Sequence, residues 1–138
     1  MDEPLVAVVR RRAGGLCEYC RLPDTLHPGA YELEHVIPKQ HGGAATLSNT
    51  AYACLHCNRH KGPNLAGIER AGAVSQLIPL FNPRRHKRDR HFRWNGALLL
   101  GRTAIGRVTV QVLAMNEPLR VALREELIAE GLFPPATT

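Results

Sequence analysis

The sequence predicts an α+β fold of one domain, spanning residues 1–138, that a bound metal ion stabilises. The length suits a single domain. Short stretches of helical and of strand character alternate along the chain, and its four cysteines lie in two Cys-x-x-Cys pairs. Aromatic residues make up only 5% of the composition, so the predicted core is aliphatic and modest. A metal site would add stability that such a core lacks.

The first half of the chain shows signals for two helices with two strands between them. In chain order we predict a helix at residues 4–13, a strand at 31–36, a second strand at 50–54 and a short helix at 55–61. Pro4 suits the first turn of the first helix, and Gly14-Gly15 ends it. Pro38 ends the first strand, and Gly62 ends the second helix.

The second half is predicted to begin irregularly and then to form a hairpin and helices. Residues 63–83 should lack regular structure because prolines interrupt them. Asn95-Gly96 is a favoured two-residue turn, which predicts a hairpin over residues 91–100. Thr103 is a suitable cap for a helix that extends to Met115, although the alternating valines of this stretch leave a strand open.

The final helix has clear boundaries in the sequence. Asn116 is predicted to cap a helix over residues 117–130, with Gly131 after its end. An apolar stripe is predicted to face the rest of the domain, and it consists of Leu119, Ala122, Leu123 and Leu127. Residues 84–138 thus form a predicted extension of basic segment, hairpin and helices beyond a metal-binding core at residues 14–63.

The chain has an excess of positive charge that favours a polyanionic partner. Its net charge is +6, and only three of its 18 basic residues are lysine. Arginine presents a planar fork of donors that matches phosphate oxygens. Residues 84–93 carry six basic side chains and one acid, so we expect them to follow a nucleic-acid backbone, with a solvated linker as the alternative. The predicted nucleic-acid contacts are Arg59, Lys61, Arg84, Arg85, Lys87, Arg88 and Arg90.

The two cysteine pairs, with residues 21–53 between them, predict one structural zinc site. Zinc binds four thiolates tetrahedrally, and such a closed set leaves no position open for catalysis. The alternatives for these cysteines are a redox dithiol and disulfides. We see no leader peptide and no apolar run long enough to cross a membrane, so we expect a cytoplasmic chain whose paired thiols stay reduced and bind metal. The predicted ligands are Cys17, Cys20, Cys54 and Cys57.

A second pattern of chemically active residue types stands between the cysteine pairs and just after them. It runs Glu34-His35-Val36-Ile37-Pro38, then Gly42-Gly43, then Leu47-Ser48-Asn49 and, after the last cysteine, Asn58-x-x-Lys61-Gly62. This pattern resembles that of the HNH nuclease family over about residues 14–63. The resemblance implies the ββα-metal fold of that family, also called the His-Me finger, stabilised here by a structural zinc site. The tail also looks like that of bacterial stand-alone HNH proteins, although this second match names no substrate.

The resemblance implies a role for each residue of the pattern. His35 would be the general base that activates water, since an imidazole titrates near neutrality. Asn49 would orient His35 by holding its other ring nitrogen. Glu34 and Asn58 would hold a catalytic divalent ion, Mg²⁺ or Mn²⁺, whose charge stabilises the transition state. Because neighbours on a strand point to opposite faces, Glu34 and His35 can serve one phosphate only where the strand ends or bends.

Two residues near the end of the pattern leave alternatives open. Lys61 lies three residues after Asn58 on the same helical face and would bind phosphate or stabilise charge. His60 would join or replace Asn58 as a ligand of the catalytic ion. The ordinary alternatives are a solvated Lys61, an Asn58 that only caps a helix and an Asn49 that only forms a turn.

These patterns favour a metal-dependent endonuclease that hydrolyses phosphodiester bonds in double-stranded DNA. RNA remains open as a substrate, since phosphate chemistry does not distinguish the sugar. The main alternative is a zinc-ribbon module that binds nucleic acid without catalysis, and a third is a structural-zinc protein that binds other proteins. The sequence leaves sequence specificity, nicking against double-strand cutting, biological role and oligomeric state open.

Overall fold

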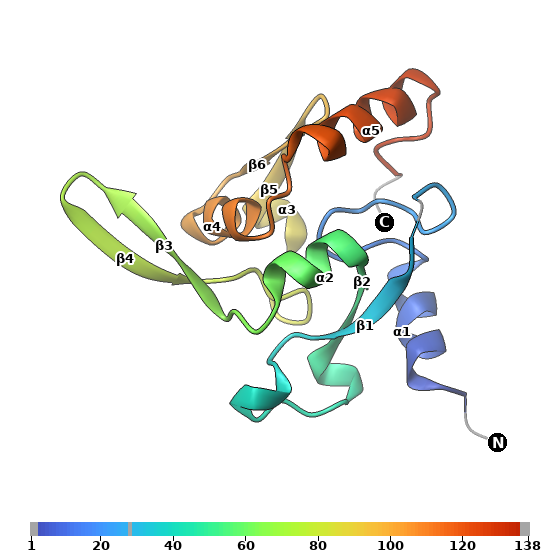
Figure 1. The fold of residues 1–138 in the computed structure, drawn as a ribbon, viewed down its shortest axis with the longest axis horizontal. Coiled ribbons are helices and arrows are strands. Elements are labelled where there is room, and N and C mark those ends of the chain that lie inside the picture. The colour runs from blue at the N-terminus through green and yellow to red at the C-terminus, as the bar shows by residue number, and fades with distance from the viewer. Residues whose placement is uncertain (1–2, 28, 136–138) are drawn as a thin grey trace.

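The computed structural model describes residues 3–27 and 29–135, which form five α-helices, two short 3-10 helices and three two-stranded antiparallel sheets. Figure 1 shows their arrangement. In chain order the elements are α1 (Leu5–Ala13), β1 (Tyr31–His35), η1 (Lys39–His41), η2 (Leu47–Asn49), β2 (Thr50–Cys54), α2 (Leu55–Lys61), β3 (Ala66–Ala71), β4 (Val74–Pro79), α3 (Arg88–His91), β5 (Phe92–Asn95), β6 (Leu98–Gly101), α4 (Ala104–Val112) and α5 (Pro118–Ala129).

The metal-binding core has the predicted ββα arrangement, and the predicted α+β fold class is confirmed. Strand β1 pairs with β2 in a register that sets Tyr31 opposite Cys54 and His35 opposite Thr50. Helix α2 follows β2 without a linker, because Cys54 both ends the strand and caps the helix. The loop between the strands carries η1 and η2; it begins directly after His35 at the end of β1 and ends at Thr50, the first residue of β2 (Figure 1).

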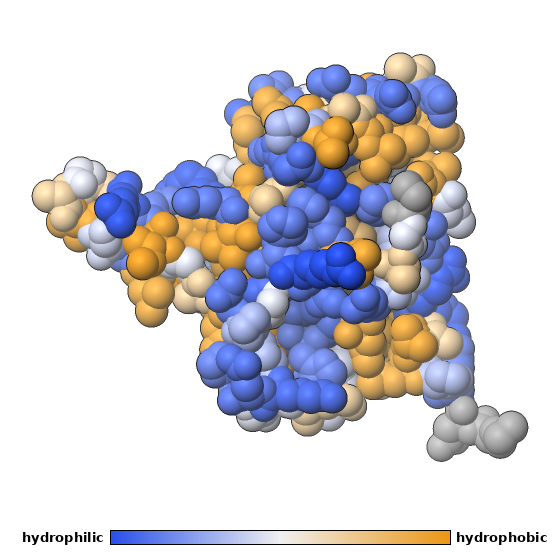
Figure 2. Space-filling view, in the orientation of Figure 1, coloured by the Kyte–Doolittle hydropathy of each residue, from blue (hydrophilic) through white to orange (hydrophobic). Residues whose placement is uncertain are grey.

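The prediction that residues 63–83 are irregular is wrong, because they contain the β3–β4 hairpin. Gly72 adopts a positive φ of 65° at its turn, and Pro79 ends β4 without interrupting it. The hairpin projects from the rest of the molecule as an arm (Figure 1). Figure 2 shows apolar side chains along this arm; Ile68, Val74 and Leu77 are exposed.

The predicted hairpin and the helix that follows it are confirmed in the extension. Strands β5 and β6 pair with Asn95 opposite Leu98, so the two turn residues are Gly96 and Ala97, one position later than predicted. Residues 104–112 form a helix and not the alternative strand, since the Thr103 hydroxyl accepts a hydrogen bond from the Gly106 N–H at 3.1 Å and caps it.

Helix α5 forms where predicted, but its cap and its inward face differ from the prediction. Glu117 caps it through a bond from the Leu119 N–H, while the Asn116 amide bonds both backbone groups of Leu99 at 2.9 Å. Leu119 is 77% exposed, and the buried face instead carries Arg120 and Arg124. The predicted apolar stripe is therefore right for Leu127, which is buried, and for Leu123, which packs against the core, but wrong for Leu119, and two arginines share the buried face.

Among the residues that the structure describes, no helix has the length and apolar character needed to span a membrane.

Candidate zinc centre and catalytic hollow

The four cysteines lie together in the interior, as predicted. Their Sγ atoms are all within 4.8 Å of one another, and all four are free and buried. A zinc ion with four Zn–S bonds of about 2.3 Å requires S···S separations of about 3.8 Å, and Cys20 Sγ lies 3.8 Å from Cys54 Sγ. The cluster can therefore hold a metal ion such as zinc, with no ligand position left for a substrate.

Each cysteine pair forms a turn in which the backbone supports the sulfur. The N–H of Cys20 points to Cys17 Sγ at 3.5 Å, and that of Cys57 points to Cys54 Sγ at 3.4 Å. The second pair gains this geometry because Cys54 is the cap of α2. Hydrogen bonds from the other three thiols, with Cys17 first, lower the pKa of Cys54, and a hydrogen bond with Cys17 is the first cause that lowers the pKa of Cys20.

A buried arginine of the extension contacts the cluster, which the sequence did not predict. Arg120 of α5 points its Nη2 to Cys54 Sγ at 3.2 Å and to Cys20 Sγ at 3.4 Å. Its Nη1 lies 2.6 Å from Nε2 of His27. Because the two sulfurs belong to different cysteine pairs, one guanidinium bridges both halves of the site. Four thiolates outweigh the charge of one zinc ion, so a cation here balances the excess.

A hollow of about 530 Å³ brings together three of the predicted catalytic residues. His35 is the last residue of β1, so the strand ends there. The sequence analysis required such an end for the neighbours Glu34 and His35 to serve one phosphate. Asn58 reaches the hollow from α2 on the facing element. The lining residues are Leu33, Glu34, His35, Pro38, Lys39, Gln40, Asn58, Gly62 and Pro63.

The His35 side chain is partly exposed at the mouth of this hollow. Its Nε2 is buried and has no hydrogen-bond partner among the described residues. This leaves Nδ1 as the ring nitrogen open to a bound water. A ring with one enclosed and one open nitrogen is suited to exchange a proton on a single side.

Asn49 positions the loop after His35 and does not hold the imidazole, which corrects the predicted contact. Its Oδ1 accepts from the Ile37 N–H at 2.9 Å, and its Nδ2 donates to the carbonyls of Ile37 at 3.1 Å and Ala44 at 2.9 Å. Gly43 fits against this clamp because a Cβ there would lie 1.6 Å from the Ile37 oxygen. Of the two glycines in the predicted pattern, Gly43 is therefore required by close backbone packing.

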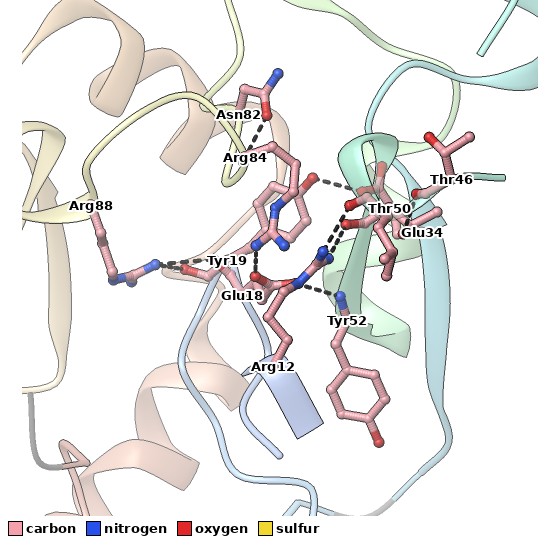
Figure 3. Close-up of polar contacts among 11 residues, drawn as sticks. Arg12, Glu18, Tyr19, Glu34, Thr46, Thr50, Tyr52, Asn82, Arg84 and Arg88 are labelled. Carbon is pink, nitrogen blue, oxygen red and sulfur yellow. Dashed lines mark hydrogen bonds and ion pairs between the residues drawn. The ribbon is translucent and has the colours of Figure 1, made fainter. Parts of the chain in front are cut away.

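Glu34 faces the interior, where Tyr19 of the first cysteine turn and Lys61 of α2 reach its carboxylate. Oε2 accepts from the Tyr19 hydroxyl at 2.7 Å, and Oε1 lies 2.6 Å from Lys61 Nζ. Figure 3 shows Tyr19 and Glu34 pointing toward each other. Burial raises the pKa of Glu34, against the opposing effects of Lys61 and Tyr19. Tyr19 was missed because nothing in its local sequence links it to Glu34.

The prediction that Lys61 binds phosphate is not supported, since its side chain is only 1% exposed. Its Nζ also donates to the backbone carbonyls of Val36 at 2.9 Å and His35 at 3.4 Å. An ammonium with these three partners has no donor left for substrate. We therefore describe Lys61 as a positioning residue that fixes the backbone carbonyls of His35 and Val36.

The two side chains predicted to hold a divalent cation, Glu34 and Asn58, both line the hollow and both have polar partners in the protein. Both carboxylate oxygens of Glu34 are engaged in the interior, since Oε1 forms the ion pair with Lys61 and Oε2 accepts from Tyr19. Asn58 donates its Nδ2 to Glu32 at 2.7 Å, and this leaves its Oδ1 turned to other partners. One carboxylate oxygen and one amide oxygen are ligands that magnesium accepts. Glu32, which the sequence analysis did not select, orients the Asn58 amide.

His60 does not share this hollow, contrary to its predicted role as a ligand. It lies two residues after Asn58 on α2, which places it on the other side of the helix. Its ring packs on His56 with centroids 4.1 Å apart, and its Nδ1 lies 2.8 Å from the His56 carbonyl.

The predicted nucleic-acid contacts divide into inward and outward residues. Arg84 forms an ion pair with Glu18, and Arg88 donates to the Tyr19 carbonyl, so both brace the first cysteine turn (Figure 3). This placement corrects their predicted role on the surface. The exposed members of the set are Arg59, Arg85, Lys87 and Arg90.

The comparison with known families agrees with this geometry. Residues 17–64 match the HNH endonuclease family. This match confirms the predicted resemblance and covers both cysteine pairs, Glu34, His35, Asn49 and Asn58. Neither the curated proteins nor the solved structures contain a match to the chain. The HNH segment thus contains the zinc cluster and the hollow, whereas Arg120 lies outside it.

Proposed function

We propose that this chain is a metal-dependent endonuclease that hydrolyses phosphodiester bonds in double-stranded DNA. The observation that carries the proposal is the hollow shared by Glu34, His35 and Asn58 in a segment of HNH type. Binding alone needs neither a base nor oxygen ligands beside it. The zinc-ribbon binding module therefore explains the cysteine cluster but not the hollow.

The chemistry assigns one proton transfer to this chain. Nδ1 of His35 takes a proton from water, whose oxygen attacks the phosphorus as the bond to the 3′-oxygen breaks. The leaving oxygen takes a proton from solvent, and the products are a 5′-phosphate and a 3′-hydroxyl. Glu34 and Asn58 would hold a divalent ion, which supplies positive charge to the phosphate oxygens when bound. Asn49 and Lys61 hold the backbone that carries His35.

The test compares native protein with His35→Ala on supercoiled plasmid, with magnesium, with manganese and with EDTA. His41→Ala is the matched control, because His41 is an exposed histidine six residues further along the chain, in η1. We expect the native protein and the control to nick the plasmid only with metal. We expect His35→Ala to lose at least about 100-fold in rate, the scale of a general base. Zinc content and circular dichroism should be equal in all three proteins.

Two outcomes would contradict the proposal. Zinc loss in His35→Ala would show that the residue supports the fold and not the reaction. No cleavage of plasmid, single strands or RNA by folded, zinc-loaded native protein would favour the non-catalytic binding module.

A further inference from the structure

A second and larger hollow lies between the first cysteine turn and the extension, and it shares no lining residue with the catalytic hollow. Its volume is about 860 Å³. It extends from Arg21, just after the first cysteine pair, over α3 and β5 to Arg102 after β6. Six basic residues line it against one acid, Asp89, and they are Arg21, Lys87, Arg88, Arg90, Arg93 and Arg102.

Most of this positive charge has no partner within the described part of the chain. Arg90 and Arg93 are exposed and form neither an ion pair nor a side-chain hydrogen bond there. Elsewhere on the molecule some exposed arginines have acids, as Arg107 has Glu69 and Arg10 has Asp24, whereas others, such as Arg70, form no ion pair with a described residue. What distinguishes this hollow is that six basic residues line it together and that none of them forms an ion pair with a described residue.

Arg88 gives an independent sign that an anion fits here. It lines the hollow and donates Nη1 to the Tyr19 carbonyl, but its Nη2 is enclosed without a hydrogen-bond partner among the described residues. Burial and the nearby Arg21 lower the pKa of Arg88 to about 10. An enclosed guanidinium beside a second one is costly until an anion satisfies both.

We propose that this hollow binds the phosphate backbone of the nucleic acid outside the catalytic hollow. Arginine forks bind phosphate oxygens in pairs, and a concave row of them positions a strand without reading its sequence. The inference rests on the proposed function for the identity of the polyanion. It adds Arg21, Arg93 and Arg102 to the predicted contacts and removes Arg84.

The hollow carries its own reporter. Trp94 is the one tryptophan of the sequence and lines the hollow, so its fluorescence should change when a strand enters. Binding of a duplex oligonucleotide is measured by this signal and by anisotropy of a labelled duplex. His35→Ala serves as the parent protein so that cleavage does not interfere.

The variant is Arg93→Gln in this parent, and the matched control is Arg70→Gln. Both residues are exposed arginines in strands, on β5 and β3 respectively, and both changes remove one charge. We expect Arg93→Gln to weaken binding about fivefold near 0.1 M salt and to reduce the slope of log K against log salt by about 1. Arg90→Gln added to it should reduce the slope by about 1 more. Arg70→Gln should change the affinity less than twofold.

Several results would overturn the proposal. One is an equal loss in Arg70→Gln and Arg93→Gln, because general charge would then suffice. Another is a Trp94 signal that does not respond to the duplex. A third is competition by polyglutamate as strong as that by unlabelled duplex, which would assign the hollow to acidic proteins.

Plasmid cleavage by the corresponding variants with His35 intact separates this inference from the proposed function. Cleavage by native protein with no effect of Arg93→Gln on binding would remove the inference alone. If Arg93→Gln loses binding but the native protein does not cleave, the proposed endonuclease activity is contradicted and the phosphate-binding role of the hollow is supported.

Discussion

The HNH segment at residues 17–64 and the extension after residue 84 bury their charged side chains in different ways. In the HNH segment the charges are paired, since Glu34 and Lys61 lie 2.6 Å apart in the interior. In the extension Arg120 and Arg124 are buried with no carboxylate partner among the described residues. Thiol sulfurs contact the first. Backbone carbonyls of Ala97 and Met115 accept from the second at 2.8 Å.

From this difference we expect the extension to depend on the negative charge of the cysteine cluster, because Arg120 contacts its sulfurs. A buried guanidinium must find anionic or carbonyl acceptors, because its own desolvation is costly. Arg120 finds them in the two cysteine turns, and so links α5 to the HNH segment. The match to the family covers the cysteine turns but not Arg120. Arg120 comes from a helix that lies more than 50 residues further along the chain.

The largest effect is expected from a change within the cluster itself. Cys54→Ala removes one thiolate and the cap of α2, so the zinc ion, which contributes on the order of 10 kcal/mol to folding in small zinc domains, would be lost. We expect insoluble or unfolded protein. Zinc content by mass spectrometry and circular dichroism check this. A soluble and fully active Cys54→Ala protein would refute the structural role of the metal.

Arg120→Met tests the dependence of the two regions on each other. Breaking a buried charge contact typically costs about 3–5 kcal/mol, so we expect a clearly lower free energy of unfolding in urea and faster release of zinc to a chromogenic chelator. Arg107→Met is the control, because it removes an exposed ion pair with Glu69 that is worth less than about 1 kcal/mol. Equal zinc release by both variants would show that the extension does not support the cluster.

The smallest effect is expected on the β3–β4 arm, which belongs to neither side of this comparison. Leu77 is 75% exposed there, so Leu77→Ser should change the free energy of unfolding by less than about 0.5 kcal/mol. Urea denaturation measures the change. A larger loss of stability would mean that the arm packs against another part of the protein in solution.

The sequence could predict those residues of the catalytic hollow whose positions in the fold follow from their spacing along the chain. Glu34, His35 and the second cysteine pair are fixed to one ββα unit by strand pairing and by the direct step from β2 into α2. The roles of Asn49 and Lys61 were less predictable. The amide of Asn49 could bond a histidine ring or the backbone, and the ammonium of Lys61 could face solvent or the interior. The choice depends on tertiary packing, which the residue type alone does not reveal.

The sequence by itself determined which four cysteines come together, which histidine lines the hollow and the order of the core elements. These features follow from local periodicity, from turn residues and from the fixed spacing of ligand types. Only the tertiary structure decided which arginines face inward, since Arg84, Arg88, Arg120 and Arg124 find acceptors on distant segments. The same is true of the Tyr19 contact to Glu34 and of the basic hollow. A charged side chain is buried or exposed according to the acceptors that folding brings to it, and these acceptors come from elements far apart in the chain.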